Sequence, residues 1–546
     1  MGTISNTSSD SLVLIISLLP FKEAARTCLL SKRFRNLWRR AELNVEFNER
    51  LHVVAAEPAQ REIQRQDFIN SVRRYIARAN NEQVNVSKFH LVLTLSQDSR
   101  VIADEGIDFS VQRSVKHLAI DFSDAAWNED RFEIDEWAAE ENEAARTYVL
   151  PESFYWMNLV LESLTLISCN FNIPRLANFH LLKKISLAWI EFPDTNLHKL
   201  LVSCVVLESL SLKNCWDLDR LDVCGNDLNL RSLVVDRCWY RVLDEFRIEA
   251  PNLMYFKYAG FCAPLFEVKN TGRVKVLDIE FGLEEDCRPE LGDSLNDLLH
   301  KLCSISTLTV CTYTLQVISM GKDPIGVQNP LGVTSLTLKT AMHGFEILGI
   351  KFFLCSCPRL EILDIVIRPG RIFYDKYRPP QYALQNPAMV WAVVDQCITE
   401  TLRRVRVMGF RGTPNEMNVL EYLIQNGRVM QNLRLIISRE VDDDGTPDTY
   451  DLRAQDLLTV RRASPDLQIA IMDNGAYLKN TLRSMVVDHR QYIWRREGVA
   501  NDNGTLSAIV SSNCAVAACV DCTVSGVAAG YAMGTANSRC CWWCIH

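Results

Sequence analysis

Two Cys-x-x-Cys pairs stand near the carboxyl end of the sequence. Cys519 and Cys522 form the first pair, Cys541 and Cys544 form the second, and eighteen residues lie between them. Four thiolates at this spacing match the ligand pattern of a zinc site, with His546 as a spare ligand. A thiol–disulfide site is a second chemistry that such pairs support. The intervening segment has few residues around which a zinc ribbon could fold, and no βαβ pattern surrounds the pairs.

The composition of this tail, residues 497–546, bears on both alternatives. Between Leu506 and Ser538 the only charged residue is Asp521, and small residues dominate. A poorly ordered appendage fits this composition best. A zinc site, an acylated cysteine-rich tail and a membrane-associating segment remain as alternatives. We therefore predict no resident cofactor.

The rest of the chain shows no pattern typical of an enzyme. The nine histidines of the whole sequence are scattered, and none shares a recognisable nucleophile motif with Ser, Cys or a carboxylate. The sequence has no P-loop, no dinucleotide fingerprint and no HExxH motif. We expect a protein without catalytic activity of its own.

Bulk properties indicate an ordinary folded protein of 546 residues. The net charge of −8 argues against general affinity for nucleic acid, and no early stretch is apolar and long enough to span a bilayer. Thirteen of the nineteen cysteines are spread singly through the body of the chain. We expect these to be reduced, buried side chains of a cytoplasmic and/or nuclear protein.

The amino-terminal stretch Ser11–Trp38 predicts three short helices. Leu12, Ile15, Ile16 and Leu19 recur at helical spacing behind the N-cap types Ser8, Ser9 and Asp10, and Pro20 ends this helix. Ser31 can cap a third helix that carries Phe34, Leu37 and Trp38. So short a segment cannot bury all of its large apolar groups, and the surplus predicts a docking face.

The run SLLPFKEAARTCLLSKRFRNLW within this stretch resembles a plant-type F-box. The resemblance implies that this head binds the small SKP-family adaptor of a cullin–RING (SCF) ubiquitin ligase. The family usually opens with ISxLPDSL, whereas this chain has Thr7 and Ser8 in place of the Leu-Pro pair. Loss of a buried Leu-sized anchor would weaken docking by roughly 1.5–3 kcal/mol. The residues that the resemblance assigns to the adaptor are Leu12, Ile15, Leu18, Leu19, Pro20, Leu29, Leu30, Phe34, Leu37 and Trp38.

A unit of the form LxxLxL returns throughout residues 86–366. Leu164, Ile185, Leu210, Leu233, Phe256 and Leu277 mark one phase of it, at intervals of 21 to 25 residues. This interval is the period of leucine-rich repeats, in which each unit contributes one strand and a return segment. A single unit cannot bury its apolar face, so the units must stack into a solenoid. The longer later intervals predict an irregular array.

The positions between the paired apolar residues of each strand must face the opposite, concave side of such a solenoid. They are mixed and mostly small or polar, which suits recognition of a protein substrate. These positions are Thr165, Ser186, Ser211, Val234, Lys257, Asp278, Thr309, Thr337 and Asp364.

Two segments interrupt the array. Residues 121–143 hold ten carboxylates against Arg131 alone, and we interpret them as a solvated acidic insertion, with a lure for a basic partner as the alternative. Residues 367–390 are rich in Pro and aromatic residues, which predicts a loop between subdomains.

Residues 391–470 predict a strand, a helix over Asn415–Gln425 and a second strand, with Gly427 as the helix C-cap. This unit resembles the FBD domain found at the carboxyl end of many plant F-box/leucine-rich-repeat proteins, and Arg461–Asp466 resembles its ending.

We thus predict an α/β chain with five parts before the tail. A three-helix F-box at 4–45 is followed by a helical linker at 46–85, repeats at 86–366, a loop at 367–390 and an FBD α/β unit at 391–470. The resemblance implies a non-catalytic substrate-recognition subunit of an SCF-type ubiquitin ligase, which acts by holding its substrate in place. An interaction module that binds no adaptor is the alternative that the missing Leu-Pro pair leaves open.

Overall fold

A computed structural model describes residues 8–19, 21–34, 37–123, 148–171, 175, 179–218, 220–225, 227–238, 245–263, 265–282, 284, 287–322, 330–374, 391–441 and 445–473. The chain divides into two compact units, Met1–Asn474 and Gly475–His546. The second unit lies outside the described residues, and with it lie the predicted zinc ligands Cys519, Cys522, Cys541 and Cys544. Most of the predicted acidic insertion also lies outside them.

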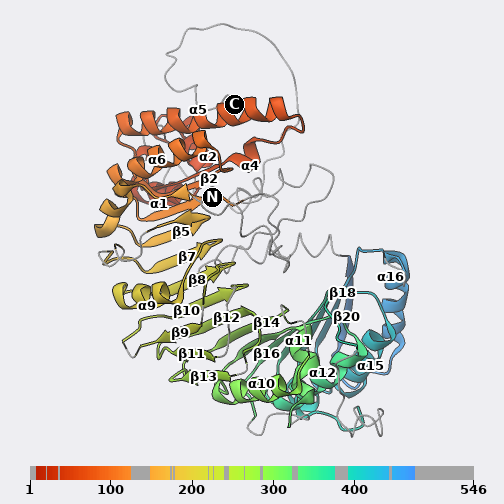
Figure 1. The fold of residues 1–546 in the computed structure, drawn as a ribbon. Helices are drawn as coiled ribbons and strands as arrows, with labels where there is room; N and C mark the ends of the chain where they lie inside the picture. The colour runs from red at the N-terminus through yellow and green to blue at the C-terminus, as the bar shows by residue number, and fades with distance from the viewer. Residues whose placement is uncertain are drawn as a thin grey trace, which may run out of the picture. The chain divides into compact units, whose positions relative to one another are not determined.

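One parallel sheet of fifteen strands organises the described part of the chain (Figure 1). Its strands follow one another in chain order, and every neighbouring pair is parallel. They are β1 (Leu43–Asn48), β2 (Val86–Val92), β3 (His117–Asp121), β5 (Ser163–Ile167), β7 (Lys184–Ala188), β8 (Ser209–Lys213), β10 (Ser232–Asp236), β12 (Tyr255–Gly260), β14 (Val276–Phe281), β15 (Thr307–Val310), β16 (Ser335–Thr340), β17 (Ile362–Ile367), β18 (Arg404–Phe410), β19 (Asn432–Ile437) and β20 (Gln468–Asp473). The predicted α/β solenoid is confirmed.

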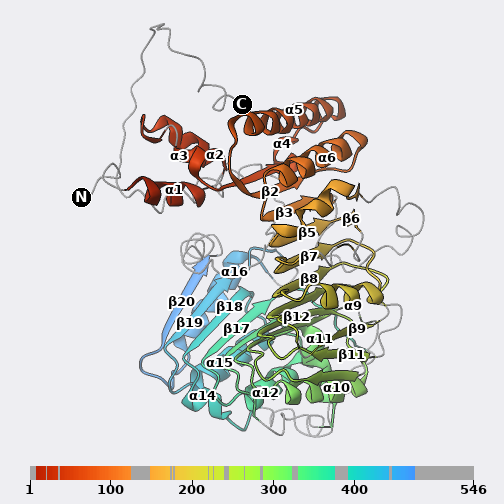
Figure 2. The same cartoon turned by 90° about the vertical axis from the view of Figure 1, so that its left-hand side faces the viewer.

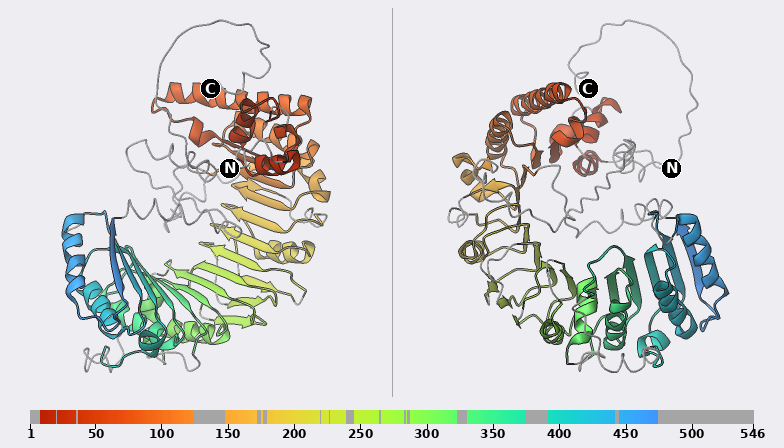
Figure 3. Two further views of the ribbon diagram at one scale, coloured as in Figure 1. Left: turned by 180° about the vertical axis from the view of Figure 1, so that it is seen from behind. Right: turned by 45° about the vertical axis from the view of Figure 1, so that its right-hand side comes forward.

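Return segments cover one face of this sheet, as Figures 1 and 3 show for α9, α10, α12 and α15. The helices are α4 (Glu49–His52), α5 (Pro58–Glu82), α6 (Gln97–Gln112), α9 (Asp194–Ser203), α10 (Pro289–Lys301), α11 (Thr312–Val317), α12 (Ile347–Ser356), α14 (Gln396–Glu400), α15 (Pro414–Asn426) and α16 (Pro447–Asp456). The 3₁₀ turns are η4 (Glu152–Leu159), η6 (Ile318–Met320), η7 (Gly344–Glu346) and η9 (Leu457–Thr459). Short strands replace helices in two places, as a pair, β4 (Tyr148–Val149) and β6 (Cys169–Asn170), and as a set of three, β9 (Leu221–Cys224), β11 (Glu245–Glu249) and β13 (Leu265–Lys269).

The apolar pair of each repeat points into the core between the sheet and its return segments. Leu164 and Leu166 on β5 are buried, whereas Thr165 between them is half-exposed. The same alternation recurs along the array and follows from the two-residue period of a strand. We call the opposite side of the sheet, which carries Thr165, the open face.

The sheet begins earlier in the chain than the sequence pattern predicts. The expected helical linker at residues 46–85 is wrong in part, because β1 begins at Leu43 and pairs with β2, while α5 packs against α6. Most of this segment forms α5, which begins at Pro58 and is followed by Gln83 in the left-handed conformation. The segment is therefore the first repeat of the array.

The sheet also continues across the predicted subdomain boundary at 367–390. β17 pairs directly with β18, so the unit predicted at 391–470 adds three more strands to the same sheet. Its predicted helix is confirmed as α15, capped by the Thr413 side chain. Gly409 has a φ of +80° at the irregularity of β18, where an added Cβ would lie 2.5 Å from the Ile367 carbonyl oxygen.

Thirteen cysteines lie in the described body of the chain. Nine of them are buried, as expected from their scatter. Cys28 and Cys224 are half-buried, and Cys303 and Cys355 are exposed, so the expectation of burial is wrong for these four.

Candidate functional site

The amino-terminal head contains α1 (Ser9–Ser17), α2 (Phe21–Arg26), the 3₁₀ turn η2 (Thr27–Leu29) and α3 (Leu37–Arg40). Helix α1 packs against α3, as Figure 2 shows. Leu12 and Ile16 on α1 and Leu37 on α3 are buried, with exposed fractions of 2%, 1% and 6%. The family resemblance assigns Leu12 and Leu37 to the adaptor interface, but in this structure they form the interior of the head.

Five large apolar side chains are exposed among the described residues of the head. Leu14, Ile15 and Leu18 lie on or just after α1, and Leu29 and Leu30 lie at η2. Their exposed fractions range from 51% to 77%. Exposed apolar groups are unremarkable singly, but five within seventeen residues indicate a binding surface. We call these five residues the head surface.

Four of the five residues in the head surface are assigned to the adaptor by the sequence pattern, which misses Leu14. Helical spacing could have identified Leu14 as a surface residue. It stands four positions before Leu18, on the same face of the helix and opposite the face of Leu12 and Ile16. Of the other assigned residues, Leu19 and Phe34 are half-buried. Pro20 and the side chain of Trp38 lie outside the described residues.

Ser8, which stands where the F-box pattern has Pro, caps helix α1. Its hydroxyl oxygen accepts a hydrogen bond from the Ser11 amide at 3.1 Å. Asp10, in the first turn of α1, also contacts α3, because its Oδ1 lies 3.1 Å from Arg40 Nη2. The departure from the family pattern therefore replaces an apolar anchor by a helix cap.

The nine residues predicted to face a substrate occupy one row of the sheet. Each pairs in register with the next along β5, β7, β8, β10, β12, β14, β15, β16 and β17. The row is Thr165, Ser186, Ser211, Val234, Lys257, Asp278, Thr309, Thr337 and Asp364. Ser211 and Val234 are only 2% and 4% exposed, whereas the other seven are half-exposed. Contact of this row with a substrate stays a prediction.

Ion pairs join the charged side chains of this row to residues on other strands of the sheet. Lys257 Nζ lies 2.6 Å from Asp236 Oδ2, and Arg406 Nε donates to Asp364 Oδ1 at 3.0 Å. Lys339 Nζ lies 3.6 Å from Asp278 Oδ1. Each charged side chain of this row thus already contacts an oppositely charged side chain outside the row, and a partner must compete with those contacts.

Glu280 on β14 is the most strongly perturbed carboxylate of this network. Burial alone would raise its pKa, but Lys339 and Arg368 outweigh burial and hold the pKa at about 2. Lys339 Nζ donates to Glu280 Oε2 at 2.6 Å, and Arg368 contacts the other carboxylate oxygen. The carboxylate is therefore ionised at neutral pH and belongs to the structure rather than to proton-transfer chemistry.

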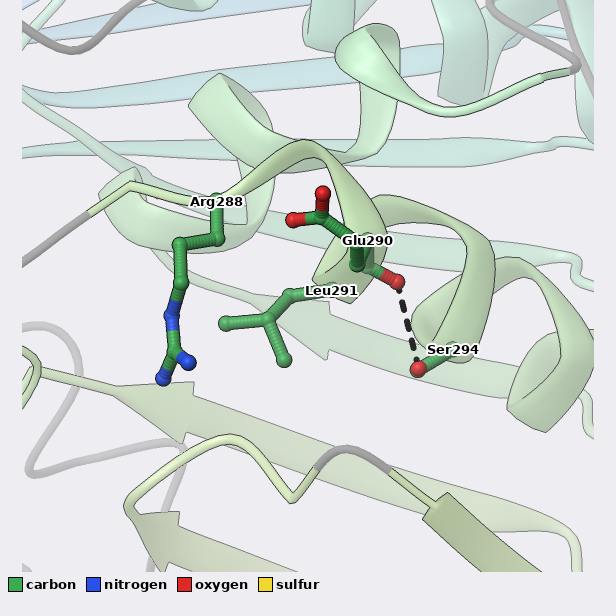
Figure 4. A pocket seen from close by; sticks show the side chains of 4 residues that line it. All are labelled: Arg288, Glu290, Leu291 and Ser294. Carbon is green, nitrogen blue, oxygen red and sulfur yellow. Dashed lines mark hydrogen bonds between the residues drawn. The ribbon is translucent and has the colours of Figure 1, made fainter.

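A pocket of about 350 Å³ opens at the start of α10, lined by Arg288, Glu290, Leu291 and Ser294 (Figure 4). Ser294 Oγ donates to the Glu290 carbonyl oxygen at 3.2 Å, which is an ordinary contact within a helix. These four residues include no base placed to activate the serine. The described residues of the pocket thus form no acid–base or nucleophilic arrangement.

Metal and membrane sites find no support among the residues that the structure describes. No group of three or more His, Cys, Asp or Glu there is placed to hold a metal ion. None of the described helices is long and apolar enough to cross a membrane.

Comparison with known proteins matches the head and the repeats to two known domains. The F-box domain profile matches residues 8–46, and a profile described as At1g61320/AtMIF1, LRR domain, matches residues 132–468. The second match extends through the unit predicted as FBD, in agreement with the continuous sheet. The fold and the head define an F-box protein with leucine-rich repeats.

Relatives from Arabidopsis thaliana are similar over most of their length. Putative F-box/LRR-repeat protein At1g56400 is 31% identical over 78% of this chain and 86% of its own. F-box protein At3g62230 is 30% identical over 81% of this chain and 92% of its own. FBD-associated F-box protein At5g22730 is 23% identical over 85% of this chain and 92% of its own. The chain belongs to the F-box/LRR-repeat family.

Proposed function

We propose that this protein is a substrate-recognition subunit of an SCF-type ubiquitin ligase. Its head surface binds an SKP-family adaptor, and through it a cullin–RING ligase, while the repeat sheet holds a protein substrate. The chain supplies position rather than chemistry, because holding a substrate lysine near a charged conjugating enzyme is sufficient for catalysis by proximity.

One observation carries the adaptor contact. The head closes its own core with Leu12, Ile16 and Leu37, and still leaves five large apolar side chains exposed. Burial of one such side chain in a partner contributes about 1.5–3 kcal/mol. The head surface therefore has enough apolar area to bind a partner without unfolding the head.

Co-purification of the full chain with the adaptor tests this proposal. Leu18→Glu combined with Leu30→Glu places two charges on the head surface and should abolish co-purification. The matched control is Leu452→Glu, a substitution of an exposed leucine on α16. Circular dichroism should show all variants folded. Unchanged co-purification of the head variant would place the interface elsewhere.

An interaction module that binds no adaptor is the second candidate, and the helix cap at Ser8 favours it. A variant with Thr7→Leu and Ser8→Pro restores the family pattern and separates the candidates. Binding by the natural chain supports the ligase subunit. Binding by the restored variant alone supports the adaptor-independent module.

A further inference from the structure

Three arginines lie together on the open face near the carboxyl end of the sheet. Arg404 and Arg406 are on β18, and Arg434 is on β19, in register with Arg406. The residues that alternate with them, Val405 and Leu433 among them, are buried in the core. The arginine side chains therefore project from the open face. We call Arg404, Arg406 and Arg434 the arginine face.

Carboxylates do not balance this charge within the described part of the sheet. Asp364 on β17 binds Arg406, with Nε donating to Oδ1 at 3.0 Å. Arg404 and Arg434 are exposed, and neither has an ion pair with any described residue. The register partners of Arg404 are Ile362 and Asn432.

The surroundings of Arg434 are equally free of acidic side chains among the described residues. Its register partners are Arg406 on β18 and Ala470 on β20. The open-face positions two residues away on these strands carry no carboxylate, namely Arg404 itself, Met408, Asn432, Ile436, Gln468 and Met472. Of the described side chains on this part of the open face, Asp364 is thus the one carboxylate, against three guanidinium groups.

The chemistry of these groups selects a particular partner. Guanidinium forks bind carboxylates in a bidentate manner and are less strongly hydrated than lysine ammonium groups. Strand spacing of about 4.8 Å and a rise of about 3.3 Å per residue place the Cα atoms of Arg404 and Arg434 roughly 8 Å apart. Alternate side chains of an extended peptide stand about 7 Å apart. Two acidic residues separated by one residue fit this spacing.

Neighbouring side chains complete the match to a peptide. The amides of Asn432 and Gln468 can bond to peptide backbone groups, which carry one donor and one acceptor per residue. Met408 and Met472, both half-exposed, supply flexible apolar contacts.

We propose that the arginine face binds an extended acidic segment of a partner protein, with carboxylates on alternate residues held by Arg404 and Arg434. The assignment of this acidic segment to the ligase substrate rests on the proposed function. Binding of the segment itself requires no adaptor.

Fluorescence anisotropy of the purified full chain tests the proposal. The probe is a labelled peptide of alternating Glu and Ser, compared with an otherwise identical peptide of alternating Gln and Ser. The acidic peptide should bind, its affinity should fall as salt increases, and the Gln peptide should bind at least about tenfold more weakly.

Variants assign the binding to these residues. Arg404→Gln combined with Arg434→Gln should weaken binding of the acidic peptide by about tenfold or more. The matched control, Arg428→Gln with Arg461→Gln, removes two exposed arginines outside the strands and should leave affinity within about twofold. Equal loss in both double variants would show a diffuse charge effect and overturn the proposal.

Two further outcomes would also overturn it. One is equal binding of the Glu and Gln peptides, and the other is tighter binding of a single-stranded oligonucleotide than of the acidic peptide. Adaptor co-purification of the Arg404→Gln/Arg434→Gln variant should be unchanged. In the natural chain, a lack of peptide binding with adaptor co-purification retained would refute the acidic-segment proposal alone. Peptide binding without adaptor co-purification would refute the ligase proposal alone.

Discussion

Lys339 Nζ lies 2.6 Å from Glu280 Oε2, although their strands, β16 and β14, are not neighbours in the sheet. The strand between them, β15, ends at Val310, before the register position of Glu280. Arg368, just after β17, contacts the same carboxylate. Charged side chains thus connect repeats where the backbone hydrogen bonds of the intervening strand have ended.

Removing Lys339 should destabilise the repeats in a pH-dependent manner. Glu280 has a pKa of about 2 in the folded chain against a reference of 4.5, so it contributes stability above pH 4.5 that is lost as pH falls toward 2. We expect Lys339→Met to lower the free energy of unfolding by about 1–3 kcal/mol at neutral pH. The difference from the natural chain should shrink between pH 4.5 and 2.

Thermal unfolding of both proteins across that pH range measures the effect. Lys322→Met, at a lysine that is 87% exposed, is the control and should leave stability unchanged at every pH. A Lys339→Met deficit that stays constant down to pH 2 would contradict the assignment.

Glu284 should have the opposite pH dependence. Burial raises its pKa to about 7, and one of its oxygens, Oε2, is buried without a hydrogen-bond partner among the described residues. Its other oxygen accepts a hydrogen bond from the Cys262 amide at 2.5 Å. Because the folded pKa exceeds the unfolded value, stability is lost as pH rises from 4.5 to 7.

Glu284→Gln should therefore raise the melting temperature above pH 7 and have little effect at pH 4.5. The exposed Glu290→Gln is the matched control and should change neither. Differential scanning calorimetry at the two pH values checks this expectation, and a Gln variant less stable than the natural chain above pH 7 would refute it.

A buried ion pair joins the last repeats on the covered face. Lys351 Nζ on α12 lies 2.7 Å from Asp395 Oδ2, and Tyr422 Oη on α15 donates to the same oxygen at 3.0 Å. Both charged side chains are nearly inaccessible to solvent. Lys351→Met leaves the Asp395 charge buried without its cation, at a cost of about 3–5 kcal/mol.

Urea unfolding of Lys351→Met measures that cost. The double variant Lys351→Met/Asp395→Asn removes both charges and should recover part of the lost stability. If the double variant is as unstable as the sum of the two single variants, the two side chains do not interact.

The repeats are predictable from sequence because their signal is local. Each strand of the fifteen-stranded sheet from β5 to β14 has two apolar residues separated by one, and successive strands repeat this pattern at intervals of 21 to 25 residues. The same regularity is sufficient to assign Thr165 and its eight partners to one register row. Neither inference requires knowledge of contacts between distant residues.

The first repeat and the short strands of the covered face escape sequence-based prediction for a physical reason. β1 alternates as Leu43, Val45 and Phe47 but lacks the leading leucine of the repeat, and only its pairing with β2 shows that it belongs to the sheet. Ion pairs such as Lys339–Glu280 link residues 59 positions apart on strands that are not adjacent. No spacing rule within the sequence contains that information.

In the head, the sequence pattern cannot separate interior from surface. Leu12 and Leu14 are both leucines on one helix, yet the first is 2% exposed and the second 65%. Leu12→Ala should destabilise the head by about 2–5 kcal/mol, as expected for a buried leucine, whereas Leu14→Ala should change stability by less than about 0.5 kcal/mol.

Amide hydrogen exchange resolves this difference better than global unfolding, because the head can open while the sheet remains folded. Leu12→Ala should speed exchange in α1 and α3 and leave β14 unaffected, since α1 packs against α3. Leu14→Ala should leave exchange unchanged throughout and weaken only adaptor co-purification. Faster exchange in Leu14→Ala would show that Leu14 supports the fold of the head, and would remove it from the head surface.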